Sequence, residues 1–336
     1  MKTYRHDDKP IRIFGLPEFT KTGKLTRLPD EVIEKVPSLT HYGRRCHGAR
    51  MEFMTDAKEL TVELMLKTLD VDRGMSLYHC QSLYVLAGER KNSEYLGLVT
   101  PPDYETKQVS KTFKLSGEMQ NITIWFPRNE QVEYISVTVP DEAKVEEVPD
   151  YTHPVPILYY GSSITEGGCC CNGFNCYNGI ISRHLDADFI SLGFSGSAKG
   201  EPAIAEYINT LDFSVFVYDY DHNAPNIAHL ERTHEPFFKT IREAKPDVPI
   251  IMMTRPKVRY DDEEKMRREI VRRTYENAVA AGDKNVYFLD GETFYGDEDR
   301  ELCSMDLIHP NDLGFYRMAM AIEPTVKKIL EGLRFE

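Results

Sequence analysis

Polar residues that could carry out acyl transfer follow several apolar runs of the sequence. The run VPILYYG leads into Gly161, Ser162 and Ser163, so hydroxyl groups stand directly after a stretch with the character of a buried strand. Near the C-terminus, MDLIHPND places Asp306 three residues before His309. In acyl transfer a serine attacks, an imidazole takes its proton, and a carboxylate orients the imidazole. A serine from the first stretch and this Asp–His pair would supply all three groups.

Two more stretches offer groups that could stabilise the negatively charged oxygen of an acyl-transfer intermediate. SLGFSG contains Gly193 and Gly196 at the end of the second apolar run, and DYDHN brings Asn223 just past the third. Glycine amides and asparagine side chains are common donors to such an oxygen. Asn223 could instead cap the helix that follows it, which is a frequent role of asparagine.

The apolar runs that lead into these residues have the pattern of strands buried on both faces. From residue 155 they are short and almost continuously apolar, and longer amphipathic stretches with helical spacing separate them. This alternation predicts an α/β domain with a parallel sheet covered by helices. Ligands of such sheets bind beyond the carboxyl ends of the strands. We therefore expect the polar residues above to meet at one edge of the sheet.

Residues 1 to about 150 have a different pattern. Short runs rich in β-branched and aromatic residues, such as ELTVELMLK, MSLYHCQSLYVLAG and NITIWFP, are separated by glycine and proline turns, with almost no helical stretch. This pattern predicts an all-β sandwich or jelly roll. The acidic, proline-broken stretch VPDEAKVEEVPDYTHPVP is typical of a linker. We therefore expect two domains, a β domain at residues 1–150 and an α/β domain at residues 151–336.

The α/β half resembles the SGNH, or GDSL-like, esterase family. The family's first block, Gly-Asp-Ser, is similar to the GSS of YYGSSITEGG and implies that Ser163 is the nucleophile. Its last block, Asp-x-x-His, matches DLIH and implies that Asp306 and His309 complete a catalytic triad. Its second and third blocks are similar to SLGFSG and DYDHN. They imply that Gly193 and Asn223 donate to the oxyanion, together with the main-chain amide of Ser163.

The sequence departs from the family pattern at two positions. Ser162 replaces the usual aspartate of the first block, and Ser191 stands where the second block often has asparagine. The first change leaves the chemistry intact, because that aspartate does not attack the substrate. The second change could alter how the oxyanion loop is held.

The resemblance implies a fold and an activity. The implied fold is a flavodoxin-like SGNH-hydrolase domain preceded by a β-sandwich, as in a subset of the family whose members often act as carbohydrate O-acetyl esterases. The implied reaction is hydrolysis of short acyl esters, acetyl above all, on a sugar or oligosaccharide through an acyl-enzyme, without a cofactor. Two alternatives stay open, an acyltransferase with the same triad and an inactive carbohydrate-binding protein.

Several other residues have a functional interpretation that competes with a structural one. GFSGS nearly spells the nucleophile elbow G-x-S-x-G, which would make Ser195 the nucleophile of an α/β-hydrolase. Trp125 could line a sugar-binding surface or belong to the core. Cys169, Cys170 and Cys171 are adjacent and lack a second pair at zinc spacing, so the sequence favours a packed loop over a metal site.

Composition and charge narrow the class of protein. The 336 residues carry a net charge of −13, which disfavours binding to nucleic acid. No stretch approaches the roughly 18 apolar residues of a membrane span, and the N-terminus lacks the apolar core of a signal peptide. Seven cysteines, an odd number, fit reduced thiols in a reducing compartment. We therefore expect a cytoplasmic protein that binds a small acylated substrate, and its assembly into a homo-oligomer stays open.

Overall fold

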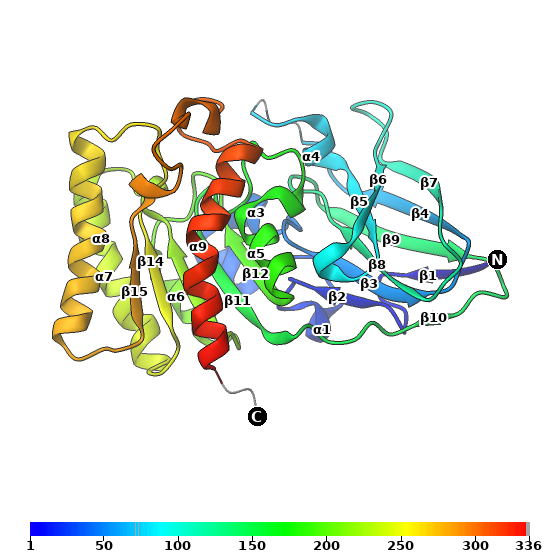
Figure 1. Ribbon diagram of the computed structural model, residues 1–336, viewed down its shortest axis with the longest axis horizontal. Coiled ribbons are helices and arrows are strands. Elements are labelled where there is room, and N and C mark those ends of the chain that lie inside the picture. Colours follow the sequence, from blue (N-terminus) through cyan, green and yellow to red (C-terminus); the bar gives the residue numbers. More distant parts are fainter. Residues whose placement is uncertain (71, 73, 334–336) are drawn as a thin grey trace.

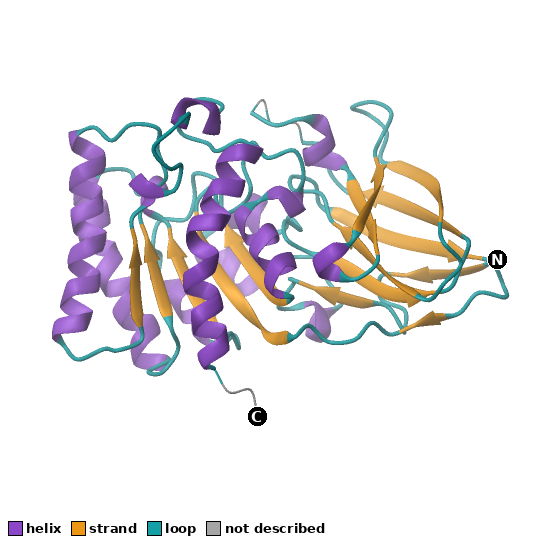
Figure 2. Cartoon of the chain, viewed as in Figure 1, coloured by secondary structure: helices purple, strands orange, loops and turns teal. Residues whose placement is uncertain are grey.

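The computed structural model describes residues 1–70, 72 and 74–333. Two regions lie next to each other, strands of the N-terminal half on one side and a helix-covered sheet of the C-terminal half on the other (Figures 1 and 2). Within the described ranges, no helix is both long enough and apolar enough to span a bilayer.

The C-terminal half contains a five-stranded sheet in which every neighbouring pair is parallel. Its order is β12-β11-β13-β14-β15, so the first of these strands in the chain lies between the second and the third, as in flavodoxin-like folds. The strands are β11 (His153–Gly161), β12 (Ala187–Gly193), β13 (Val215–Asp219), β14 (Ile250–Met253) and β15 (Val286–Leu289). The predicted α/β class is therefore confirmed.

Helices cover both faces of this sheet. Successive residues of a strand point to opposite faces, so neighbouring residues are buried by different helices. They are α5 (Tyr177–Leu185), α6 (Pro202–Asn209), α7 (Ile227–Ala244), α8 (Asp262–Ala280) and α9 (Asp312–Gly332). Tyr159 belongs to the buried cluster that includes α5 and α9, whereas Tyr160 belongs to the cluster that includes α6, α7 and α8. Both tyrosines are fully buried, as expected for a strand in the middle of a covered sheet.

The ends of the long helices follow local sequence signals. Asp261 and Glu264 form a capping box at the start of α8, and Gly282, with a φ of 92°, follows its end. The side chains of Asn226 and Asn311 accept main-chain N–H groups at the starts of α7 and α9. These caps set where each helix begins, and so fix the loops between strand ends and helices.

The N-terminal half forms two antiparallel sheets packed face to face. One has the order β1-β9-β4-β7 and the other β10-β3-β8-β5-β6, with β2 added beside β3. Alternate residues of both sheets meet in one buried cluster, which includes Val62 and Val137 of the first sheet and Phe53 and Ile122 of the second. The strands are β1 (Lys2–Arg5), β2 (Arg12–Phe14), β3 (Arg50–Thr55), β4 (Glu59–Leu66), β5 (Leu83–Ala87), β6 (Glu94–Val99), β7 (Gln108–Lys114), β8 (Gln120–Trp125), β9 (Val132–Val139) and β10 (Val145–Glu146). The predicted all-β sandwich is confirmed.

Short helices interrupt the N-terminal half, which the sequence pattern did not predict. The run MSLYHCQSLYVLAG, expected to be extended throughout, starts as a helix because Ser76 accepts the N–H of His79, and only its second part forms β5. The short helices are α1 (Phe19–Thr22), α2 (Asp30–Lys35), α3 (Thr40–Gly43) and α4 (Leu77–Gln81). Short 3-10 turns occur in both halves. In the N-terminal half they are η1 (Pro37–Leu39) and η2 (Arg90–Asn92), and in the C-terminal half η3 (Gly173–Asn175), η4 (Asp221–Asn223), η5 (Gly291–Thr293) and η6 (Arg300–Cys303).

The segment that contains α2 packs against the α/β region rather than inside the sandwich. Leu28, Val32, Ile33 and Leu39 are buried in the same cluster as Phe194 and residues of α6. Part of the N-terminal half therefore completes the core of the C-terminal half.

Candidate active site

Ser163 stands at the carboxyl end of β11, the second strand of the parallel sheet in spatial order. β11 ends at Gly161, where no side chain would fit, because a Cβ atom would lie 2.2 Å from the carbonyl oxygen of Asp219 on β13. The next residues form a helical turn, in which the N–H of Glu166 donates to the carbonyl oxygen of Ser162 (3.0 Å). This tight exit places Ser163 in the wall of a cleft.

A chain of hydrogen bonds links Ser163 to the Asp–His pair predicted near the C-terminus. The hydroxyl oxygen of Ser163 lies 2.9 Å from Nε2 of His309. Nδ1 of His309 lies 2.7 Å from Oδ2 of Asp306. The other carboxylate oxygen accepts the main-chain N–H groups of Ile308 (2.9 Å) and His309 (2.7 Å). Leu307, which follows Asp306 directly, has a left-handed φ of 69°. The turn therefore folds back and brings the side chains of Asp306 and His309 together.

These contacts also set the protonation pattern of the three side chains. Burial favours the neutral acid, but the hydrogen bonds from the main chain and ring of His309 outweigh it and lower the pKa of Asp306. The ionised carboxylate can only accept, so Nδ1 of His309 carries the ring proton. Nε2 is then free to accept the hydroxyl proton of Ser163, which is the arrangement that a serine nucleophile requires.

Asn223 lies in η4, directly after β13, and lines the same cleft. Its Nδ2 donates one hydrogen bond to the carbonyl oxygen of Phe194 (2.8 Å), which fixes the orientation of the amide. A side-chain amide carries two N–H groups, so the second one can donate to a ligand in the cleft. The alternative role as helix cap is not realised, since Asn226 caps α7.

Gly193 occupies a different place from the one expected of an oxyanion donor. It is the last residue of β12, pairs with Gly161, and a Cβ atom there would lie 2.4 Å from the main-chain nitrogen of Glu166. Its carbonyl oxygen accepts a hydrogen bond from Arg27 (2.6 Å). Among the described residues of this loop, the cleft is lined by Ser195 and Gly196 instead.

Gly196 is thus the glycine of SLGFSG that the structure brings to the cleft, and the sequence-based choice of Gly193 missed it. Gly196 is exposed, has a left-handed φ of 65°, and has open space where a Cβ atom would lie, as far as the described chain shows. The strand register contains the signal that distinguishes the two, because Gly193 pairs with Gly161 as the final residue of β12. Donors to a ligand then come from the residues after it.

Ser195, the rival nucleophile, is engaged by charged groups and not by an imidazole. Its hydroxyl donates to Oε2 of Glu166 (2.5 Å) and accepts a hydrogen bond from Arg128 (2.7 Å). Its main-chain N–H donates to the same carboxylate oxygen (3.1 Å). The side chain therefore holds the loop and lacks the base that a nucleophile needs.

Glu166 is the centre of a buried ion network that the sequence analysis did not identify. Its Oε1 accepts a hydrogen bond from Arg27 (2.7 Å) and its Oε2 accepts one from Arg128 (3.1 Å). The side chains of Glu166, Arg27 and Arg128 are at most 2% exposed. Burial favours the neutral acid, but the charges of Arg128, Arg27 and Arg45 outweigh it and lower the pKa of Glu166 to about 2. Glu166 is therefore ionised at neutral pH.

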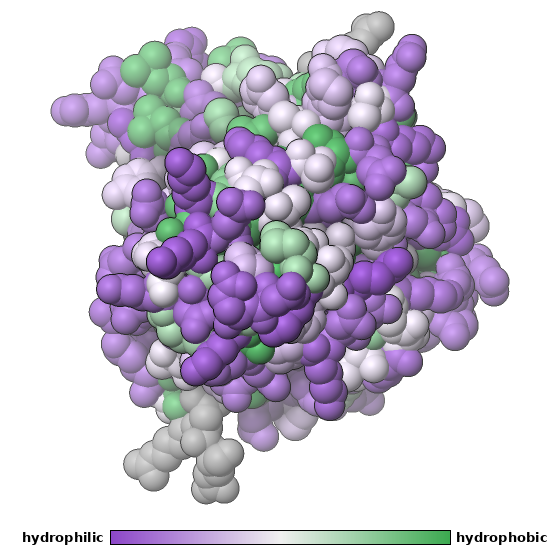
Figure 3. All heavy atoms as spheres, turned by 90° about the vertical axis from the view of Figure 1, so that its right-hand side faces the viewer, coloured by the Kyte–Doolittle hydropathy of each residue, from purple (hydrophilic) through white to green (hydrophobic). Residues whose placement is uncertain are grey.

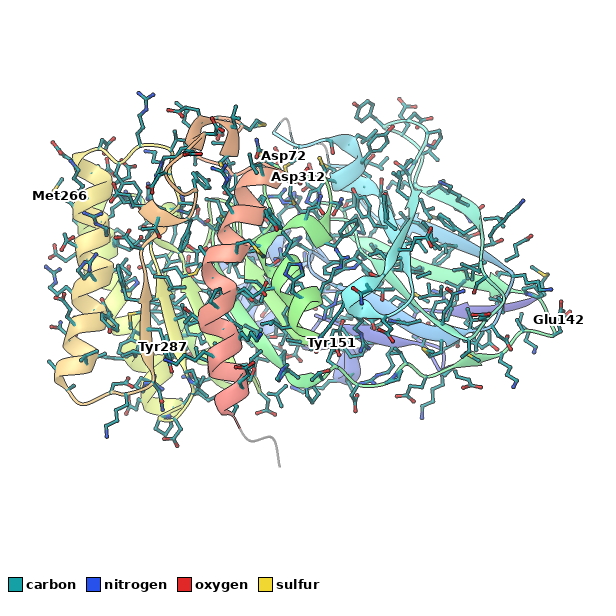
Figure 4. The ribbon with its side chains drawn as sticks, in the orientation of Figure 1. Asp72, Glu142, Tyr151, Met266, Tyr287 and Asp312 are labelled. Atoms are coloured by element: carbon teal, nitrogen blue, oxygen red, sulfur yellow. The ribbon has the colours of Figure 1, made fainter. Side chains whose placement is uncertain are left out.

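The cleft has a volume of about 450 Å³ and is built by both halves of the chain. Figure 4 labels Asp72 of the N-terminal half and Asp312, the first residue of α9, at the same upper end of the molecule. The lining residues from the C-terminal half are Ser163, Gly168, Cys169, Ser195, Gly196, His222, Asn223, Met305, Asp306, Ile308 and His309. Those from the N-terminal half are Tyr42, Asp72, Gly74, Met75 and Arg128.

The mouth of the cleft carries exposed apolar side chains. Met305, Leu307 and Ile308, on the turn that holds the Asp–His pair, are 56%, 60% and 42% exposed. Seen from the side of the β-sandwich, hydrophobic residues gather toward the upper end of the molecule, while much of the lower part is hydrophilic (Figure 3). The hydrogen-bonding groups of the cleft therefore have apolar surface beside them.

The adjacent cysteines point to different surroundings. Sγ of Cys169 donates to the carbonyl oxygen of Gly74 (3.2 Å), Sγ of Cys170 donates to that of Gly167 (3.0 Å), and Cys171 is exposed. Burial raises the pKa of the Cys169 thiol to about 12, so it stays protonated. Across the residues that the structure describes, no group of three or more His, Cys, Asp or Glu side chains could hold a metal ion.

Trp125 belongs to the core and not to a sugar-binding surface. It is 3% exposed and packs against Phe174 and Phe189. The interpretation as an exposed aromatic platform is therefore excluded.

The strand order, with polar groups of several loops gathered at the carboxyl ends, defines an α/β domain of the SGNH type. The chain belongs to the GDSL-like lipase/acylhydrolase family, which matches residues 154–327, just over half of its length. Membership of this family assigns the protein to the hydrolases that act on esters. A comparison with curated protein sequences finds no match.

Several solved structures share the whole fold at low sequence identity. A Bacteroides ovatus protein assigned as a GDSL-like lipase has a TM-score of 0.88 at 21% identity, over 100% of this chain and 99% of that one. The salicylyl-acyltransferase SsfX3 from a tetracycline biosynthetic pathway has a TM-score of 0.80 at 19% identity, over 98% and 97%. A family two carbohydrate esterase from Clostridium thermocellum, solved with cellohexaose, has a TM-score of 0.62 at 16% identity, over 85% and 94%. The arrangement of a β-sandwich beside the α/β domain is thus a shared fold.

Proposed function

We propose that the protein is a serine esterase that removes short acyl groups, acetyl above all, from a sugar or oligosaccharide. The observation that carries this proposal is the hydrogen-bonded series Ser163–His309–Asp306 at the wall of an open cleft. A nucleophile, a base with the required free nitrogen and an orienting carboxylate stand in the order that acyl transfer needs.

In the proposed reaction, the hydroxyl oxygen of Ser163 attacks the ester carbonyl carbon while its proton moves to Nε2 of His309. The carbonyl oxygen becomes an oxyanion, which the side-chain amide of Asn223 and the main-chain amides of Gly196 and Ser163 stabilise. The intermediate collapses, and the alcohol leaves with the proton from His309. Water, activated by the same imidazole, then attacks the acyl-enzyme and releases the acid.

The choice of a carbohydrate substrate rests on the structural neighbours and on the cleft. One neighbour was solved with cellohexaose, and the cleft here has a volume of about 450 Å³ and is lined by both halves of the chain. The seven free thiols fit the proposal that the enzyme works in the cytoplasm. The intact series of three side chains argues against an inactive carbohydrate-binding protein.

Acyl transfer to an alcohol is the second candidate, because the salicylyl-acyltransferase shares the fold with a TM-score of 0.80. Both reactions use the same acyl-enzyme and differ only in the acceptor. A sugar alcohol that bound in the mouth of the cleft would compete with water for the acyl group.

The proposal is tested with nitrophenyl esters of increasing chain length and with peracetylated sugars. We expect the highest kcat/KM with the acetate, a decline toward the octanoate, and release of acetate from the sugar. Product analysis with and without a free sugar acceptor separates hydrolysis from transfer. An enzyme that cleaved none of these esters would contradict the proposed function, and one that preferred the octanoate would contradict the assignment to short acyl groups.

A further inference from the structure

We infer that Arg128 and Arg27, both from the N-terminal half, are positioning residues that hold the oxyanion loop through Glu166. This inference rests on the proposed function and extends it, because it makes the β-sandwich half a working part of the esterase site. The loop in question is residues 193–196, the oxyanion loop, which brings Gly196 to the cleft.

Arg128 connects the end of the sandwich to two loops of the α/β region at once. It lies in the turn after β8, and its Nε donates to the carbonyl oxygen of Glu166 (3.0 Å). Its Nη2 donates to the carboxylate of Glu166 (3.1 Å) and to the hydroxyl of Ser195 (2.7 Å). One guanidinium thus fixes both the turn after the nucleophile and the residue beside Gly196.

Arg27 holds the same loop from its other end. Its Nη1 donates to the carbonyl oxygen of Gly193 (2.6 Å), and its Nη2 donates to Oε1 of Glu166 (2.7 Å). Its guanidinium lies over the ring of Phe194, with 5.0 Å between the carbon and the ring centre. The residues from Gly193 to Ser195 are therefore held by two buried arginines, Arg27 and Arg128, which both donate to the buried carboxylate of Glu166.

This arrangement matters for catalysis because an oxyanion donor acts only when its N–H group points at the developing charge. Gly196 is exposed and left-handed, so its own packing does little to hold it. It lies in a turn that the N–H of Ser197 closes onto the carbonyl oxygen of Phe194 (2.9 Å). The residue directly before it, Ser195, is held by Glu166 and Arg128. A displacement of about 1 Å at a catalytic group can lower the rate about 100-fold.

A second buried arginine at the same interface offers a matched control. Arg50 is fully buried, pairs with Asp188 near the start of β12, and donates to the carbonyl oxygen of Phe189 (3.1 Å). It therefore holds the amino end of β12, whereas Arg27 contacts the carboxyl end of β12 and Arg128 contacts the loop that follows it. Loss of either arginine leaves a buried anion short of a partner, so both changes should lower stability.

The test compares Arg128→Met and Arg50→Met in the full chain with nitrophenyl acetate. We expect Arg128→Met to lower kcat about 10- to 100-fold with little change in KM, and to weaken binding of an alkyl boronic acid, which forms a tetrahedral adduct, by a similar factor. Arg50→Met should lower the melting temperature but keep kcat and boronate binding near those of the wild type.

Arg128→Met with wild-type kcat and boronate binding would show that Arg128 only joins the two halves. If Arg128→Met does not fold, Arg128→Lys decides, since it keeps the charge but cannot make all the bonds to Glu166 and Ser195 at once. An unchanged kcat in that variant would overturn the inference. A wild-type chain without activity on any ester would instead overturn the proposed function, so the two failures are distinguishable.

Discussion

At the scale of single residues, the turn from Asp306 to His309 is the most local part of the candidate site. One carboxylate accepts two main-chain N–H groups of its own turn and the ring of His309, and the left-handed Leu307 makes this possible. Because all of these contacts lie within four residues, the spacing Asp-x-x-His could predict them. Ser163 is far away in the sequence, and its contact with His309 depends on the whole sheet.

The two members of the Asp–His pair should differ in how much they contribute. His309→Ala removes the base and should reduce kcat on the order of 10⁶-fold, close to the effect of Ser163→Ala, whereas Asp306→Asn should cost on the order of 10⁴-fold. Steady-state kinetics with nitrophenyl acetate, with circular dichroism to check folding, measures both. Full activity in His309→Ala would remove the acyl-transfer interpretation.

Asn223 tests the oxyanion assignment. Asn223→Ala should lower kcat about 100- to 1,000-fold, the usual effect of one lost donor, while the melting temperature stays close to that of the wild type. Asn226→Ala is the control, since it removes the cap of α7 and should reduce stability without this loss of turnover. Undiminished turnover in Asn223→Ala would mean that another donor serves the oxyanion.

At the scale of elements, the parallel strands and their helices could be predicted because their periodicities differ and each extends over many residues. The short helices α1 to α4 could not, since four to six residues carry no periodic pattern. The sequence also could not show which glycine, Gly193 or Gly196, lines the cleft. Both lie at the end of the same apolar run, and only the pairing of β12 with β11 distinguishes them. In the ion network, Glu166 lies 139 positions from Arg27 and 38 positions from Arg128 in the sequence. No local sequence signal exists for contacts over such distances.

That network should make stability depend on pH in a defined direction. The pKa of Glu166 falls from 4.5 to about 2 on folding, so its contribution is fully present above about pH 4.5 and is lost as the pH falls toward 2. The free energy of unfolding of wild type and Glu166→Gln, measured in urea, should therefore differ most above pH 4.5 and converge at lower pH. Glu142→Gln, an exposed residue at the far end of the sandwich (Figure 4), should track the wild type throughout. A difference that stayed constant down to pH 3 would contradict the assignment.

At the scale of the whole molecule, the two halves are joined by more than the linker between them. Leu28, Val32, Ile33 and Leu39 lie in the core of the α/β region, and each buried side chain of this kind contributes about 1.5–3 kcal/mol. Arg128 and four other residues of the N-terminal half line the cleft. The composition of the two halves predicted two folds, but it could not show that one half supplies core and cleft to the other.

We therefore expect the fragment 151–336 to be unable to form a stable native fold by itself. Its far-ultraviolet circular dichroism should show incomplete structure and its thermal transition should be broad or absent, while the full chain melts cooperatively. Addition of residues 1–150 as a separate chain is the companion measurement and should restore part of the transition. A fragment that melted cooperatively and hydrolysed nitrophenyl acetate at the rate of the full chain would contradict this view.

The central claim, that Ser163 is the nucleophile of a serine esterase, is tested most directly by covalent labelling. The full chain is treated with diethyl nitrophenyl phosphate, which phosphorylates activated serines, and the adduct is located by mass spectrometry of peptides. We predict one adduct per chain, on Ser163, and no adduct in Ser163→Ala, while Ser162→Ala and Ser195→Ala are still labelled on Ser163. An adduct on Ser195 or Ser162, or an unlabelled wild-type chain, would contradict the account.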